Sequence, residues 1–104
     1  MTTKDFLKRY DNGDEFSERE LRYLFWIDAF EDEDYEVIEE VDGENRRWSY
    51  MKDIYMRIQD RYFRFTADIG LTEYQENTYD FQPQEVTLTQ ETKTIIVNVW
   101  KDKN

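Results

Sequence analysis

A chain of 104 residues is the size of one domain, since domains cluster at roughly 100–150 residues. It contains no Cys and no His, which excludes disulfides, Cys/His zinc sites and catalysis by Ser-His-Asp or Cys-His groups. Its 25 acidic and 14 basic residues give a net charge of −11, a field that repels phosphate backbones and anionic membranes. We therefore expect no direct binding to nucleic acid or to a membrane.

The composition predicts a folded chain rather than an acidic disordered tail. Aromatic residues make up 17% of the chain, whereas disordered segments are poor in large apolar side chains. We expect no signal peptide, because no apolar run follows a basic stretch in the first residues, and no segment approaches the roughly 20 apolar residues that a membrane span needs. We expect a cytoplasmic protein.

The first thirty residues are predicted to be helical. A short helix begins after Thr2 or Thr3 and ends at residues 11–13, Asp-Asn-Gly. A second helix is expected from Glu18 to about Phe30.

The start of the second helix carries two local signals. Ser17 and Glu20 have the spacing of a capping box. Phe16 and Leu21 stand at the positions of a hydrophobic staple on either side of the cap. These signals predict that the helix begins directly after Ser17.

After the second helix the hydrophobic period changes from 3.6 to 2, which predicts strands. Asp42-Gly43 is a hairpin-turn signal, and Gln59-Asp60 predicts a second turn. The expected strands are residues 35–41, 46–58, 61–68, 85–89 and 94–100. The sequence thus predicts an α+β fold in a single domain (1–104), with two N-terminal helices (1–30) packed on a four- to five-stranded antiparallel sheet (35–100).

The segment 28–44, here called the acidic stretch, carries ten carboxylates and no basic residue. One interpretation is a solvated loop and edge hairpin that keep the protein soluble and block strand-to-strand aggregation. The other is an anionic surface that occupies the phosphate-binding groove of a basic partner. The candidate partner-binding residues are Glu31, Asp32, Glu33, Asp34, Glu36, Glu39, Glu40, Asp42 and Glu44, with Trp26 and Phe30 as apolar anchors.

No metal or cofactor is expected. A calcium loop beginning at Asp32 would place Val37 where the sharp turn requires glycine. The chain also lacks a Gly-rich phosphate loop and a nucleophile elbow, so we do not expect an enzyme.

Two other features have alternative interpretations. Basic residues gather between positions 46 and 64, where they either pair with carboxylates across strands or form a cationic face, beside Tyr55 and Tyr62, for an anionic small ligand or RNA. These residues are Arg46, Arg47, Lys52, Arg57, Arg61 and Arg64. The second helix is apolar over an unusually wide arc, and its second stripe is either buried or an interface for a homodimer or a target. That stripe consists of Tyr23, Trp26, Ile27 and Phe30.

Several short motifs in the second half resemble those of a known group. They are Arg-Arg-Trp at 46–48, Asp-Arg-Tyr-Phe at 60–63, Gly-Leu-Thr-Glu-Tyr-Gln-Glu-Asn at 70–77, Gln-Pro-Gln-Glu-Val at 82–86, and Trp100 before a charged tail. Over roughly residues 46–100 the chain resembles small acidic proteins, mostly hypothetical, encoded by phages and prophages of Gram-positive bacteria. The resemblance implies an accessory role in the bacterial host cell and no reaction. The Thr, Glu, Gln and Asn of its loop are more typical of side-chain-to-backbone hydrogen bonds than of ligand contacts.

Together these features predict a non-catalytic inhibitor with a surface like that of a nucleic acid. Its expected partner is a basic nucleic-acid-binding protein of host defence, which makes it an anti-CRISPR or anti-restriction protein. Two alternatives remain: a module that sequesters a nucleotide on Arg57, Arg61 and Arg64, and a structural or regulatory phage protein that acts as a homo-oligomer.

Overall fold

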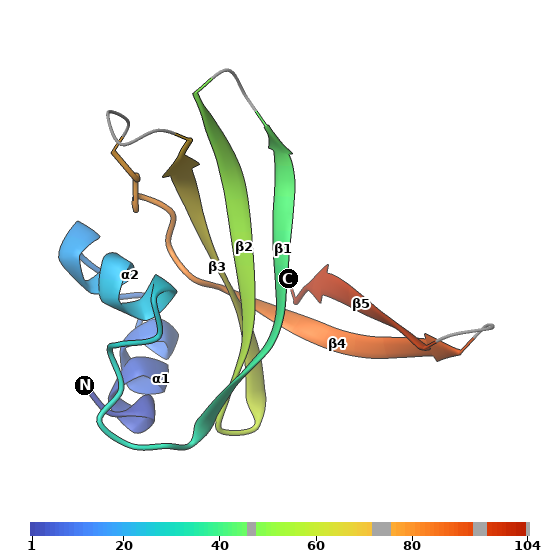
Figure 1. Ribbon diagram of the computed structural model, residues 1–104. Helices are drawn as coiled ribbons and strands as arrows, with labels where there is room; N and C mark the ends of the chain where they lie inside the picture. The colour runs from blue at the N-terminus through green and yellow to red at the C-terminus, as the bar shows by residue number, and fades with distance from the viewer. Residues whose placement is uncertain (46–47, 72–75, 93–95, 104) are drawn as a thin grey trace.

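A computed structural model describes residues 1–45, 48–71, 76–92 and 96–103. Two short helices precede five strands (Figure 1), which confirms the α+β prediction. The elements are α1 (Thr3–Asp11), α2 (Glu18–Phe25), β1 (Tyr35–Asn45), β2 (Ser49–Ile58), β3 (Arg61–Gly70), β4 (Gln84–Thr92) and β5 (Ile96–Asp102). Neither of the described helices has the length and apolar character needed to cross a membrane.

The five strands form one antiparallel sheet in the order β1-β2-β3-β4-β5, so β1 and β5 are its edges. β2 and β3 pair along their whole length, from Ser49 opposite Gly70 to Ile58 opposite Arg61. β3 and β4 pair only over residues 62–64 and 84–86. The hairpin of β4 and β5 therefore diverges from the other three strands and curls away from them (Figure 1).

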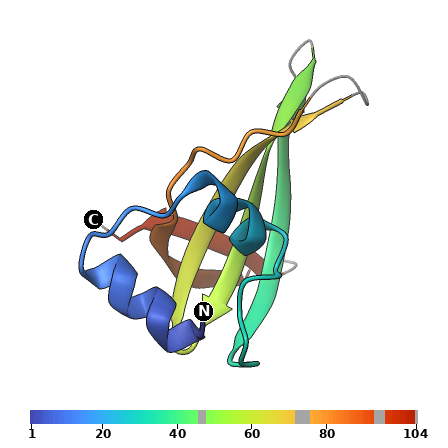
Figure 2. The ribbon, with the colours of Figure 1, turned by 90° about the vertical axis from the view of Figure 1, so that its left-hand side faces the viewer.

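Both helices cover the same face of β1–β3 (Figure 2), and the core lies between these two layers. Its fully buried side chains come from α1, α2, β2 and β3 and include Phe6, Leu24, Phe25, Ile54, Met56, Ile58 and Phe63. On the opposite face of the sheet, Trp100 of β5 stacks on Tyr55 of β2 with ring centroids 4.4 Å apart. The end of β5 that carries Trp100 thus contacts β2, although the rest of the β4–β5 hairpin points away from it (Figure 1).

The predicted start of α2 is confirmed. The Ser17 hydroxyl accepts a hydrogen bond from the Glu20 backbone N–H, and the Glu20 carboxylate accepts one from the Ser17 N–H. Phe16 and Leu21 are both buried, as a hydrophobic staple requires. Thr2 caps α1, as predicted, and forms a second capping box with Asp5.

The predicted end of α2 is wrong, because the helix stops at Phe25 rather than near Phe30. Ile27 has a φ of 61°, in the left-handed region that a helix cannot contain. The Ile27 N–H donates to the Leu24 carbonyl (3.2 Å) and the Asp28 N–H to the Tyr23 carbonyl (2.9 Å). This pair of bonds is the Schellman ending, normally made with glycine, so the sequence carried no signal for it.

The hairpin turn predicted at Asp42-Gly43 is also misplaced, because both residues lie within β1. Asp42 pairs with Lys52 of β2, and Asn45 still pairs with Tyr50. A Cβ on Gly43 would come within 3.2 Å of the Met51 carbonyl oxygen. Glycine therefore permits a close approach of two strands here and does not form the turn.

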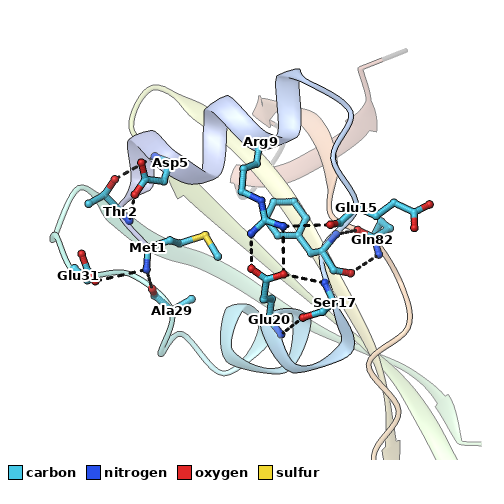
Figure 3. Close-up of polar contacts among 11 residues, drawn as sticks. Met1, Thr2, Asp5, Arg9, Glu15, Ser17, Glu20, Ala29, Glu31 and Gln82 are labelled. Carbon is cyan, nitrogen blue, oxygen red and sulfur yellow. Dashed lines mark hydrogen bonds and ion pairs between the residues drawn. The ribbon is translucent and has the colours of Figure 1, made fainter.

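An ion pair joins the two helices. The Arg9 guanidinium donates two hydrogen bonds to the Glu20 carboxylate and a third to the Glu15 carbonyl (Figure 3). The hydrogen bond from Arg9, followed by the one from the Ser17 backbone, lowers the pKa of Glu20 from 4.5 to about 2. Glu20 thus serves both as the cap of α2 and as the link to α1.

We expect Glu20 to make the protein sensitive to acid. Because its folded pKa is depressed, the stability it contributes is fully present above pH 4.5 and is lost as the pH falls toward 2. Melting temperatures of wild type and Glu20→Gln, measured between about pH 6 and about pH 2, check this prediction. The wild-type curve should fall more steeply than the variant's, and parallel curves would show that the pair contributes nothing.

Candidate functional site

The acidic stretch begins after α2, follows the connection into β1 and continues along this edge strand. Seven of its candidate residues have exposed side chains, namely Glu31, Glu33, Asp34, Glu36, Glu40, Asp42 and Glu44. Asp32 and Glu39 are half-buried. The exposed carboxylates therefore run along one side of the molecule, from the helix layer to the far end of β1.

The first part of the acidic stretch is fixed to the body by a small polar cluster around Thr3. Asp32 accepts hydrogen bonds from the Thr3 N–H (2.7 Å) and hydroxyl (2.5 Å), which lower the pKa of its carboxyl. The Gln59 amide donates to the Thr3 hydroxyl (3.2 Å), and the Gln59 N–H donates to the Asp34 carbonyl (2.9 Å). Thr3 is only 1% exposed, so this cluster holds the acidic connection against α1 and the β2–β3 turn.

Gln59 holds its place in the Thr3 cluster although its backbone conformation is unfavourable. It stands in the two-residue turn between β2 and β3 with a φ of 55°, an uncommon conformation for a residue other than glycine. Its side-chain and backbone bonds to Thr3 and Asp34 offset that cost. The sequence predicted the turn but gave no sign that it would hold the acidic segment.

The second part of the acidic stretch is only partly neutralised. Arg57 lies 3.3 Å from Asp34 and 3.8 Å from Glu36. Lys52 lies 3.3 Å from Glu40 and 3.8 Å from Asp42. Each cation is shared by two carboxylates. Each set of one cation and two carboxylates therefore keeps a net negative charge.

Three further carboxylates of the acidic stretch add to its negative charge. Glu31 lies 3.8 Å from the α-ammonium of Met1, which also donates to the Ala29 carbonyl (Figure 3). Within the described residues, Glu33 and Glu44 have no ion-pair partner. The surface therefore remains strongly negative after all its described contacts are counted.

A bulge in β1 decides which face each carboxylate takes. The register against β2 shifts between Val37 and Glu39. Glu39 consequently lies opposite Tyr55, where its carboxylate accepts a hydrogen bond from the Trp100 indole, while Glu40 lies on the helix-bearing face. Glu39 thus joins β1 to β5, and its carboxylate serves the fold more than a partner.

The two candidate aromatic anchors differ. Trp26 is 48% exposed, and its indole N–H donates to the Tyr79 hydroxyl (2.6 Å), which fixes the orientation of the ring. Phe30 is half-buried and packs edge-on against Phe6 and obliquely against Tyr35. Trp26 is therefore available as an anchor, whereas Phe30 mainly completes the core.

The basic residues of β2 and β3 are not gathered into one ligand site. Arg61 binds Glu85 and Asp11, and the hydrogen bonds to Glu85 and then to Asp11 raise its pKa further above the ordinary value. Arg64 lies 3.0 Å from Asp102. The alternation along β3 puts Arg61 on the helix-bearing face and Arg64 on the other.

These contacts do not favour the nucleotide-binding alternative, because each guanidinium of its proposed site already faces a carboxylate. Arg46 and Arg47 lie outside the described residues. Among the described residues, no group of three or more acidic side chains has an arrangement suited to a metal ion.

The motifs that carry the phage resemblance have structural roles where they are described. The Asn77 side chain accepts from the Gly70 N–H (2.9 Å) and donates to the Tyr79 hydroxyl (3.0 Å). The Gln82 amide binds both the N–H and the carbonyl of Phe16 (2.9 and 3.0 Å; Figure 3). The bonds to the backbone of Gly70 and Phe16 are of the side-chain-to-backbone kind expected from the sequence, although residues 72–75 of the loop lie outside the described part.

A shallow hollow of about 310 Å³ lies between the helices, and sequence reasoning missed it. Its lining residues are Met1, Arg9, Glu20, Tyr23, Asp28 and Ala29. Because Arg9 and Glu20 bind each other across it, the hollow offers little unpaired charge apart from Asp28. It adjoins the start of the acidic stretch.

Comparisons with protein-family models, with curated proteins and with solved structures found no match.

Proposed function

We propose that the protein is a non-catalytic binding protein whose acidic stretch occupies the basic nucleic-acid-binding groove of a partner protein. The observation that carries this proposal is the combination of anchoring and incomplete neutralisation. The cluster of Thr3, Asp32 and Gln59 fixes the segment, while Lys52 and Arg57 are each shared by two carboxylates. A rigid surface loses little conformational entropy on binding, and its charge accelerates association with a basic groove.

The biological setting of the proposal comes from the phage resemblance. A phage protein that blocks a basic groove would act in the cytoplasm of the bacterial host on an enzyme that binds invading nucleic acid. We therefore propose an inhibitor of the anti-CRISPR or anti-restriction type. The alternative interpretation of the acidic stretch, as protection of an edge strand, predicts no such partner.

A competition assay with two matched variants tests the proposal. Glu33→Lys/Glu44→Lys reverses two carboxylates of the acidic stretch that no described ion pair uses. Asp14→Lys/Glu15→Lys reverses two exposed carboxylates in the connection between the helices, so the net charge of the two variants is equal. The assay measures displacement of a fluorescent DNA duplex from purified guide-loaded CRISPR nucleases and restriction endonucleases by anisotropy.

We expect wild type to displace DNA from at least one nuclease. The variant in the acidic stretch should be about ten- to a hundredfold weaker, because each reversed charge faces a basic groove. The control variant should stay close to wild type. No displacement by wild type from any of the nucleases, or equal weakening in both variants, would contradict the proposal.

A further inference from the structure

The outward face of α2 carries a stripe that the core does not cover. Arg19, Arg22, Tyr23 and Trp26 are spaced i, i+3, i+4 and i+7, so they share one side of the helix and its cap. The opposite side consists of the buried Leu21, Leu24 and Phe25. Tyr23 is 40% and Trp26 48% exposed, and α2 lies at the surface in front of the sheet (Figure 2). We call these four residues the α2 stripe.

The two arginines of the α2 stripe differ from the other described arginines. Arg9, Arg57, Arg61 and Arg64 all face carboxylates. Within the described part of the chain, Arg19 and Arg22 have no carboxylate at ion-pair distance. Two guanidiniums without a carboxylate partner among the described residues are unexpected in a chain with 25 acidic residues. Arginine beside exposed tyrosine and tryptophan is instead typical of protein interfaces.

The order of residues in the α2 stripe is self-complementary. It reads cation, cation, aromatic, aromatic, so a second copy packed antiparallel presents each arginine to an aromatic ring. We propose that the α2 stripe is the contact surface of a homodimer, in which Arg19 faces Trp26 of the partner subunit and Arg22 faces Tyr23 of the partner subunit. Twofold symmetry repeats both contacts, which is the requirement for a closed dimer.

The side chains of Arg19 and Trp26 are already oriented for these contacts in the single chain. The Arg19 guanidinium already lies 5.8 Å from the centroid of the Tyr23 ring in its own chain, so the arginine is disposed along the aromatic surface. The bond between the Trp26 indole and the Tyr79 hydroxyl fixes the tryptophan ring before binding. A cation over an aromatic face contributes about 0.5–1 kcal/mol at an exposed site, and fixed rings lose less entropy when they are buried.

The contact area and the charge set the strength of this dimer. Four side chains on a helix of eight residues bury far less than the roughly 800 Å² per partner of a standard interface. Two copies with a net charge of −11 also repel each other. The dimer is therefore weak, and salt strengthens it by screening the repulsion. Binding of the acidic stretch to a basic partner has the opposite salt dependence, so the two proposals can fail separately.

Sedimentation velocity of the full chain tests the dimer, from about 10 μM to about 1 mM protein and in about 0.05 M and about 0.5 M NaCl. Arg22→Glu places a carboxylate in the α2 stripe, and Lys4→Glu makes the same charge change on the exposed side of α1. Arg22→Gln and Lys4→Gln form a second matched pair that avoids a carboxylate near the C-terminus of α2. Circular dichroism verifies that each variant is folded.

We expect the weight-average mass of wild type to rise above 12.9 kDa with concentration, approach twice that value and rise further with salt. The substitutions at Arg22 should raise the dissociation constant about tenfold or more relative to the matched substitutions at Lys4. A wild type that stays at 12.9 kDa under all conditions overturns the proposal, as does association beyond the dimer. Equal effects at Arg22 and Lys4 also overturn it.

Discussion

Replacing Phe6 by alanine is expected to lower the free energy of unfolding by about 3–5 kcal/mol. Phe6 is 0% exposed, and its ring contacts five other aromatic rings from α1, β3 and the connections between elements. Removing it leaves a cavity where α1 meets the sheet, in addition to losing buried apolar area. Because α1 also anchors the acidic stretch through Thr3, loss of Phe6 should loosen the candidate site as well.

Urea denaturation at equilibrium measures this effect. Phe81→Ala serves as the control, because that ring is 45% exposed and its loss should cost about 1 kcal/mol or less. A similar decrease in the free energy of unfolding for Phe6→Ala and Phe81→Ala would show that α1 is not an integral part of the core.

The second large effect is expected for Arg61→Ala, which should lower the free energy of unfolding by about 3 kcal/mol. Glu85 is 8% exposed and accepts two hydrogen bonds from Arg61, both 2.9 Å long. The same guanidinium binds both oxygens of Asp11 at 2.8 and 2.9 Å. Its removal leaves a buried carboxylate with Lys103 as its remaining described cation and removes the ion pair that joins Asp11 of α1 to the start of β3.

Arg57→Ala is the matched control for Arg61→Ala. Arg57 forms exposed ion pairs with Asp34 and Glu36, worth about 1 kcal/mol or less, and donates one hydrogen bond to the Gln59 carbonyl, worth about 1 kcal/mol. The free energies of unfolding of the two variants should therefore differ by about 1–2 kcal/mol. A smaller loss for Arg61→Ala than for Arg57→Ala would contradict the importance of the Glu85 network.

The parts of the fold that the sequence predicted are those with local signals. The capping box at Ser17, the staple of Phe16 and Leu21, and the alternation in β2 and β3 each depend on residues a few positions apart. These local structures could therefore be predicted without knowledge of any tertiary contact. The antiparallel pairing of β2 with β3 followed from the short turn between them, whereas the long connection of residues 71–83 joins β3 to β4.

The boundaries that were wrong depend on tertiary contacts. Ile27 ends α2 in a conformation that glycine normally adopts, and it packs against the core there. Gly43 resembles a turn residue, but it serves the close approach of β1 to Met51. Sequence periodicity cannot reveal a β-branched residue in a helix ending or a glycine used for strand contact.

The candidate site was predictable in composition but not in geometry. The sequence located the acidic stretch and the basic segment beside it. It could not show that a bulge after Val37 would turn Glu39 toward Trp100 and Glu40 toward Lys52. It also gave no sign that Thr3, more than twenty residues away, would hold Asp32. These contacts determine which carboxylates stabilise the fold and which remain exposed to a partner.

The salt dependence of binding tests the central claim most directly. For a nuclease identified by the competition assay, the dissociation constant is measured at several NaCl concentrations with wild type, Glu33→Lys/Glu44→Lys and Asp14→Lys/Glu15→Lys. If the acidic stretch lies in the basic groove, a plot of the logarithm of the dissociation constant against the logarithm of the NaCl concentration rises for wild type and for Asp14→Lys/Glu15→Lys. The plot should rise less steeply for Glu33→Lys/Glu44→Lys. The same slope for all three proteins would contradict binding through this surface.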